Sequence, residues 1–229
     1  MMLKNYKTLL FDIDDTLLDF KKAEHIAFKQ LLAHHNIDYT DTTFQLYLSI
    51  NEPLWKDYEL GKLDRATVLS SRFEQFFAHY QLSVSGKECD ILYRSYLTIG
   101  NQLLDGALEL IDTVSKTHQL AIVTNGVYDT QMARLKNNGL LPYFKHIFVS
   151  DKVGFQKPDK RFFDTIWQEM NITDTSSVLI IGDSLGADIK GGQNTGIDTC
   201  WINPTHQPNT LAHPITYTVD ALQDLYTLF

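Results

Sequence analysis

The chain has 229 residues, and its 28 acidic against 20 basic side chains give a formal net charge of −8 at pH 7. This length suits one large domain, or one domain that carries a smaller insertion. The excess of acid argues against a protein that binds long nucleic acids, which needs a basic face. It also argues against a polybasic membrane anchor.

The two cysteines, Cys89 and Cys200, lie far apart in the sequence and form no CxxC motif. This spacing argues against a disulfide framework or a cysteine-based zinc site and fits a reducing compartment. The N-terminus lacks the apolar segment of a signal peptide, and no stretch approaches the ~18 apolar residues of a membrane span. We therefore expect a cytoplasmic protein without a membrane segment, and the sequence points to no protein partner.

Short apolar runs with abrupt polar ends predict buried parallel strands. The runs occupy residues 8–11, 120–123, 146–149 and 178–181, with a fifth candidate at 199–202. Helical patterns at 127–138, 160–170 and 189–195 separate the later runs. Pro158 is predicted to lie in a first helical turn, and Gly196 to end a helix. This alternation predicts an α/β fold with a doubly wound parallel sheet.

About a hundred residues separate the first strand from the second, and they show helical periodicity. Two apolar stripes carry this pattern, one over residues 23–32 and one over 68–80. We therefore predict a core formed by residues 1–16 and 101–229, with an all-helical domain inserted at 17–100.

Polar side chains follow the predicted strands, where an open α/β sheet binds its ligands. In chain order they are Asp12 and Asp14, Thr124 and Asn125, Lys157, then Asp183 and Asp188. Each residue type also has an ordinary use in turns and helix caps, so the prediction depends on the whole set.

The set combines the groups needed for phosphoryl transfer. Carboxylates from two strands, Asp12 and Asp14 on one and Asp183 on the other, suit a hard cation such as Mg²⁺. Thr124 and Asn125 at a helix N-terminus can hold a phosphate, and Lys157 can neutralise its charge. A carboxylate can also act as the nucleophile and form an aspartyl-phosphate.

The motifs resemble those of the haloacid dehalogenase (HAD) superfamily of phosphatases. They are residues 12–17 (DIDDTL), Thr124 within 123–126 (VTNG), Lys157–Pro158, and 182–188 (GDSLGAD). The insertion after the first motif resembles the C1-type helical cap of this superfamily.

The resemblance implies a role for each residue. Asp12 would be the nucleophile, and Asp14 would act as general acid and then as general base. Mg²⁺ would be held by Asp12, the backbone carbonyl of Asp14, and Asp183. The phosphoryl oxygens would contact Thr124, Asn125 and Lys157. A further residue, Asp188, would orient Lys157 or a water on the metal.

A narrower resemblance connects residues 51–61, 72–74 and 199–203 to the pyrimidine 5′-nucleotidase branch. It implies hydrolysis of nucleoside monophosphates such as UMP, dUMP and dTMP. Trp55 and Tyr58 are candidates either for stacking on a base or for packing within the insertion. The alternatives are a phosphatase for a sugar phosphate or a phosphoglycolate-like metabolite, and a catalytically silent binding module. A dehalogenase is disfavoured because Asp14 supplies the acid that dehalogenases of this superfamily lack.

Overall fold

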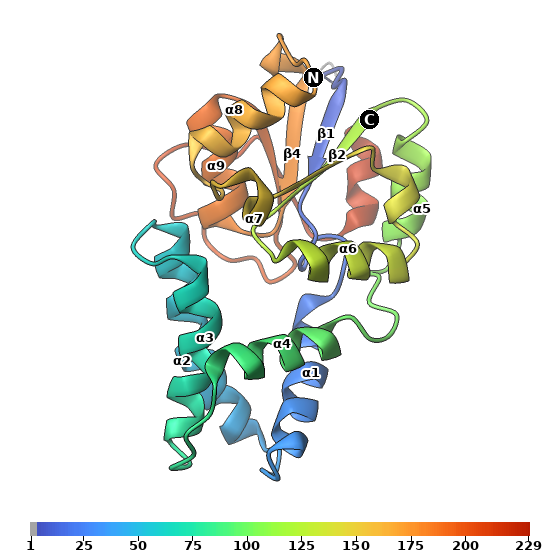
Figure 1. Ribbon diagram of the computed structural model, residues 1–229. Coiled ribbons are helices and arrows are strands. Elements are labelled where there is room, and N and C mark those ends of the chain that lie inside the picture. The colour runs from blue at the N-terminus through green and yellow to red at the C-terminus, as the bar shows by residue number, and fades with distance from the viewer. Residues whose placement is uncertain (1–3) are drawn as a thin grey trace. The chain divides into compact units, whose positions relative to one another are not determined.

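The structure, a computed structural model, describes residues 4–229 and divides into two compact units. One unit joins the chain up to Phe20 to Asn101–Phe229, and the other is Lys21–Gly100 (Figure 1).

A parallel sheet forms the centre of the first unit. Within residues 4–229 it has six strands in the order β3-β2-β1-β4-β5-β6. Their bounds are β1 Thr8–Phe11, β2 Gln119–Thr124, β3 His146–Val149, β4 Val178–Gly182, β5 Asp198–Ile202 and β6 Tyr217–Val219. The five predicted strands are present, and β6 is an additional one.

Helices cover both faces of this sheet, as a doubly wound fold requires. Successive residues of a strand point to opposite faces, and Leu9 and Leu10 accordingly belong to different hydrophobic clusters. The Leu9 cluster includes α5 (Ala107–Val114) and Leu135 of α6 (Tyr128–Asn137). The Leu10 cluster includes the buried face of α8 (Lys160–Glu169). The predicted α/β fold class is therefore confirmed.

The remaining short elements of this unit connect the strands. They are α7 Ser150–Val153, α9 Lys190–Thr195, the π-helical turn η3 Leu185–Ile189, and the 3₁₀ turns η1 Leu141–Tyr143, η2 Thr175–Ser177 and η4 Leu222–Thr227. Gly196 ends α9 in the left-handed conformation, as predicted.

The prediction that Pro158 lies in the first turn of a helix is wrong. Asp159 is the N-cap of α8, and its side chain accepts a hydrogen bond from the backbone of Arg161. Pro158 therefore lies before the cap, in the segment that carries Lys157. The carboxylate of Asp159 supplies the capping acceptor that proline cannot replace.

The second unit, Lys21–Gly100, is helical. It contains α2 Asp41–Glu59, α3 Arg65–Ala78 and α4 Gly86–Leu97, together with all of α1 (Phe20–His34) except Phe20. Side chains of Thr40, Asp64 and Ser85 cap three of these helices.

The predicted apolar stripes of this unit are largely buried, with one error. Val68, Phe73 and Phe76 are fully buried, whereas Ile26 is 43% exposed. Phe28 occupies the interior instead and stacks on Tyr47 at 4.3 Å between ring centroids. Helical spacing alone did not decide whether Ile26 or Phe28 lies on the buried face of α1.

Tyr58, a candidate for base stacking, packs inside its own unit. Its side chain is 5% exposed, its ring meets Trp55 edge-on, and its hydroxyl accepts a hydrogen bond from Arg65. Tyr58 was a candidate for base stacking or for packing within the insertion, and the structure favours packing.

The cysteines behave as small buried hydrophobic residues. Cys89 and Cys200 are both buried and unpaired in disulfides. Burial raises the pKa of the Cys89 thiol to about 11 and that of Cys200 to about 12. Among the residues described, no helix is both long enough and apolar enough to cross a membrane.

Candidate active site

The predicted site residues gather where the strand order reverses. β1 lies between β2 and β4, and Phe11 pairs in register with both Ile122 and Ile181. The residues that follow these positions therefore reach the same edge of the sheet. The backbone N–H of Asp12 continues the pairing by donating to Ile181 O at 3.0 Å. A crevice at such a reversal is the usual ligand site of open α/β sheets.

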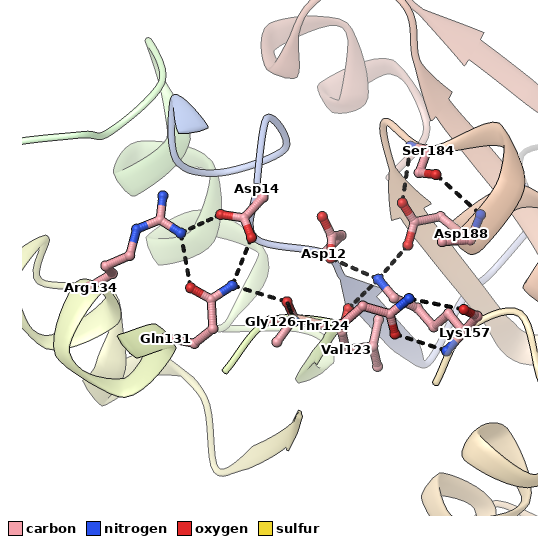
Figure 2. Close-up of polar contacts among 12 residues, drawn as sticks. Asp12, Asp14, Val123, Thr124, Gly126, Gln131, Arg134, Lys157, Ser184 and Asp188 are labelled. Atoms are coloured by element: carbon pink, nitrogen blue, oxygen red, sulfur yellow. Dashed lines mark hydrogen bonds and ion pairs between the residues drawn. The ribbon is translucent and has the colours of Figure 1, made fainter. Parts of the chain in front are cut away.

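Lys157 is the centre of a buried ionic cluster (Figure 2). The residue is 1% exposed, and Nζ donates to Asp12 Oδ1 at 2.7 Å and to Asp188 Oδ1 at 2.6 Å. The third ammonium hydrogen meets Val123 O at 2.6 Å. Asp188 is fully buried, and its other oxygen accepts from Ser184 N. Every donor of Lys157 therefore has a partner.

Burial and charge shift the pKa values of this cluster. Burial raises the pKa of the Asp12 carboxyl, the ammonium of Lys157 lowers it, and the neighbouring carboxylates raise it further, so the net shift is upward. Burial lowers the pKa of Lys157, but Asp12 and Asp188 together raise it by more. Lys157 is therefore held firmly as a cation.

The carboxylates near Lys157 form a set of oxygen donors that suits a hard cation such as Mg²⁺. One oxygen each from Asp12, Asp183 and Asp188 lie within 4.8 Å of one another. Oxygen ligands with a strong negative charge are what Mg²⁺ prefers. The residues present therefore fit the predicted ion, and Asp188 lies beside the predicted ligands with its oxygens accepting from Lys157 and Ser184. The predicted use of the Asp14 backbone carbonyl as a ligand stays a prediction.

Two local features position the acids that follow β4. The indole of Trp201 on β5 donates to the backbone carbonyl of Asp183 at 2.7 Å. A Cβ on Gly182 would lie 2.2 Å from Asp188 Oδ2, so only glycine allows this carboxylate to approach the strand.

Thr124 is the last residue of β2 and Asn125 follows it, and their side chains have different partners. Thr124 is 1% exposed, and its hydroxyl oxygen accepts from Gly126 N at 3.2 Å. The amide of Asn125 pairs with the backbone of Lys157, donating to its carbonyl and accepting from its N–H, both at 2.9 Å. Asn125 thus fixes the Lys157 segment against β2, and direct binding of a phosphate by Asn125 stays a prediction.

Asp14 is held by residues that the sequence analysis did not identify. Its Oδ2 accepts from Gln131 Nε2 at 2.8 Å, and its Oδ1 pairs with Arg134 Nη1. Both partners belong to α6 and are almost completely buried. The available signal was their spacing of three residues on the helix that follows Thr124, which places them on one helix face.

We predict that Lys157→Met lowers the free energy of unfolding by about 3–5 kcal/mol, because it leaves two buried carboxylates without their cation. Urea denaturation monitored by circular dichroism measures the change. The matched control is Lys160→Met, which removes an exposed lysine and should change stability by less than about 0.5 kcal/mol. Equal stability of the two variants would contradict the prediction.

Comparison with known proteins shows which family the chain belongs to. The HAD-hydrolase YfnB of Bacillus subtilis is 45% identical over 224 residues, covering 98% of this chain and 95% of YfnB. Its magnesium-bound crystal structure superposes with a TM-score of 0.92 at 44% identity, covering 98% of this chain and 99% of that chain.

Two further relatives carry the name pyrimidine 5′-nucleotidase. PynA of Streptococcus pneumoniae is 41% identical, covering 96% of this chain and 93% of PynA. YjjG of Escherichia coli is 31% identical, covering 96% of each chain. Residues 9–202 also match the family described as haloacid dehalogenase-like hydrolase. The resemblance predicted from the four motifs is confirmed, and the chain belongs to the haloacid dehalogenase-like hydrolase family.

Proposed function

We propose that this protein is a Mg²⁺-dependent phosphomonoesterase that hydrolyses pyrimidine nucleoside 5′-monophosphates through an aspartyl-phosphate on Asp12. The observation that carries the proposal is the buried cluster at the sheet reversal, where Asp12 meets Lys157 beside two further carboxylates. The names of PynA and YjjG support the pyrimidine nucleotide as substrate.

In the first step, a carboxylate oxygen of Asp12 attacks phosphorus and the ester P–O bond breaks. The leaving alkoxide takes a proton from Asp14, whose side chain is 30% exposed and therefore accessible. Thr124 contacts a phosphoryl oxygen, and the positive charge of Lys157 stabilises the phosphoryl group. The ammonium that meets Asp12 Oδ1 is already next to the group that becomes phosphorylated.

In the second step, water attacks phosphorus and breaks the bond to Asp12. Asp14, now ionised, takes the proton from that water, and inorganic phosphate leaves. Asp12, Asp183 and the carbonyl of Asp14 would hold Mg²⁺, which when bound offsets the negative charge of the carboxylates and phosphate. Since both steps move charge onto phosphoryl oxygens, the fixed cation at Lys157 assists each of them.

A substrate panel tests the proposal. With Mg²⁺ present, we expect kcat/KM for dTMP, dUMP or UMP to exceed that for purine nucleotides, sugar phosphates and phosphoglycolate by at least about 10-fold, since discrimination of ~1–3 kcal/mol is ordinary for pocket contacts. Equal or better values for a sugar phosphate would favour the small-metabolite phosphatase instead. If neither nucleotides nor an aryl phosphate are hydrolysed, the chain is a binding module.

We also propose that the protein is cytoplasmic and acts on a small phosphorylated substrate. The two buried, unpaired cysteines are compatible with the reducing cytoplasm. The small phosphorylated substrate is the one partner that the proposed site requires.

A further inference from the structure

The buried side chains of Gln131 and Arg134 connect two of the predicted site residues. Gln131 Nε2 donates both to Asp14 Oδ2 at 2.8 Å and to Thr124 Oγ1 at 3.1 Å (Figure 2). Gln131 is 2% exposed and Arg134 is 1% exposed. One amide group therefore contacts the predicted acid–base residue on β1's loop and the predicted phosphate-binding hydroxyl on β2.

Arg134 determines which way the amide of Gln131 points. Its Nη1 donates to Gln131 Oε1 at 2.9 Å. A guanidinium has donors and no acceptor, so the oxygen of the amide must face it. The NH₂ group then faces Asp14 and Thr124, and each of its two hydrogens has one of these acceptors. Arg134 is itself anchored through Nε, which donates to Gln102 Oε1 at 2.9 Å.

This orientation leaves Thr124 as a donor toward substrate. Its hydroxyl oxygen accepts from Gln131 Nε2 and from Gly126 N. A hydroxyl has two acceptor positions and one hydrogen, so the hydrogen stays available for another acceptor such as a phosphoryl oxygen. Gly126 permits the arrangement, because a Cβ there would lie 2.6 Å from Gln131 Nε2.

The same contacts orient the carboxyl group of Asp14 and leave each of its oxygens able to accept another hydrogen bond or a proton. Oδ1 pairs with Arg134 and Oδ2 with Gln131, so the plane of the carboxyl group is fixed at both oxygens. Each oxygen keeps a second lone pair for a proton or for water. Asp14 can therefore exchange a proton while α6 holds it in place.

We infer that Gln131, oriented by Arg134, is a positioning residue that aims the acid–base carboxyl of Asp14 and the donor hydroxyl of Thr124 at one phosphate ester. The inference rests on the proposed function, and it adds a specific role for α6. Loss of this positioning should slow the hydrolysis of some esters more than others. An alkoxide leaving group needs a proton from Asp14, whereas a nitrophenolate leaves without one.

The test compares kcat/KM for dTMP with kcat/KM for p-nitrophenyl phosphate in Gln131→Met, which keeps the size of the side chain and removes its hydrogen bonds. We expect the ratio of the two values to fall at least about 10-fold, since misplacing a catalytic group by about 1 Å can cost ~100-fold. The control is Gln168→Met on the exposed side of α8, which should leave both values unchanged.

A double-variant cycle separates positioning from damage to the fold. In an Asp14→Asn background the Gln131→Met change should no longer alter the ratio, because the proton donor is already absent. If Gln131→Met lowers both esters by the same factor, or lowers neither, the inference is wrong while the proposed function stands. If the unaltered protein hydrolyses neither ester, the proposed function fails and the inference fails with it.

Discussion

Asp12→Asn is expected to lower kcat for phosphate-ester hydrolysis by at least about 1000-fold, the order of loss seen when a nucleophile is removed. The amide cannot form the acyl-phosphate bond, yet it keeps the shape of the side chain and can still accept from Lys157. The measurement is phosphate release from dTMP and from an aryl phosphate with saturating Mg²⁺.

The matched control for this variant is Asp105→Asn, which removes an exposed carboxylate near the start of α5. Its kcat should equal that of the unaltered chain. Urea denaturation of both variants checks that the fold is retained. If Asp12→Asn keeps a tenth or more of the activity, Asp12 is not the nucleophile and the aspartyl-phosphate mechanism is wrong.

Removal of divalent cations is expected to lower turnover at least about 100-fold, with recovery on adding Mg²⁺. Asp12, Asp183 and Asp188 bring three carboxyl groups to a site where Lys157 contributes one positive charge. A phosphomonoester carries further negative charge, so the site should repel it until a cation is bound.

Ion identity and binding provide the controls for this prediction. Ca²⁺ should restore little activity, because it prefers more ligands and a larger site than Mg²⁺ does. Trp201 donates to the carbonyl of Asp183, so its fluorescence should change on Mg²⁺ binding and the change should disappear in Trp201→Phe. Full activity in the presence of excess chelator would contradict a Mg²⁺-dependent mechanism.

The strands were predictable because buried parallel strands are apolar over their whole length. The run at residues 8–11 coincides with β1, and the run at 178–181 falls within β4; both strands are buried along their whole length. β6, at Tyr217–Val219, was missed because it has three residues, of which only Val219 is buried. Such an edge strand has no apolar run by which to recognise it.

The sequence predicted which polar residues lie close together better than it predicted their hydrogen bonds. Asp12, Lys157 and Asp188 were grouped because each follows a strand, and they do meet in the ionic cluster. The pairing of the Asn125 amide with the backbone of Lys157 was not predicted. Hydrogen bonds between loops depend on backbone position, which strand patterns do not specify.

The spacing of Gln131 and Arg134 puts them on one helix face, but polar residues on a helix ordinarily indicate its solvent-exposed face. Here the helix follows β2 directly, and these two side chains are buried against Asp14 and Gln102. Their contact with Asp14 follows from the tertiary placement of α6 beside the β1 loop.

The sequence by itself determined strands β1 to β5, the helical character of the segment between β1 and β2, and the polar residues after the strands, because these follow from local hydrophobic pattern and from the common direction of parallel strands. The tertiary structure decided which of those residues contact one another. It paired Asp12 with Lys157, directed Asn125 to the backbone, and brought Gln131 to Asp14 and Thr124. Those contacts join segments up to 145 positions apart in the chain, and they depend on strand order and register, which no local pattern contains.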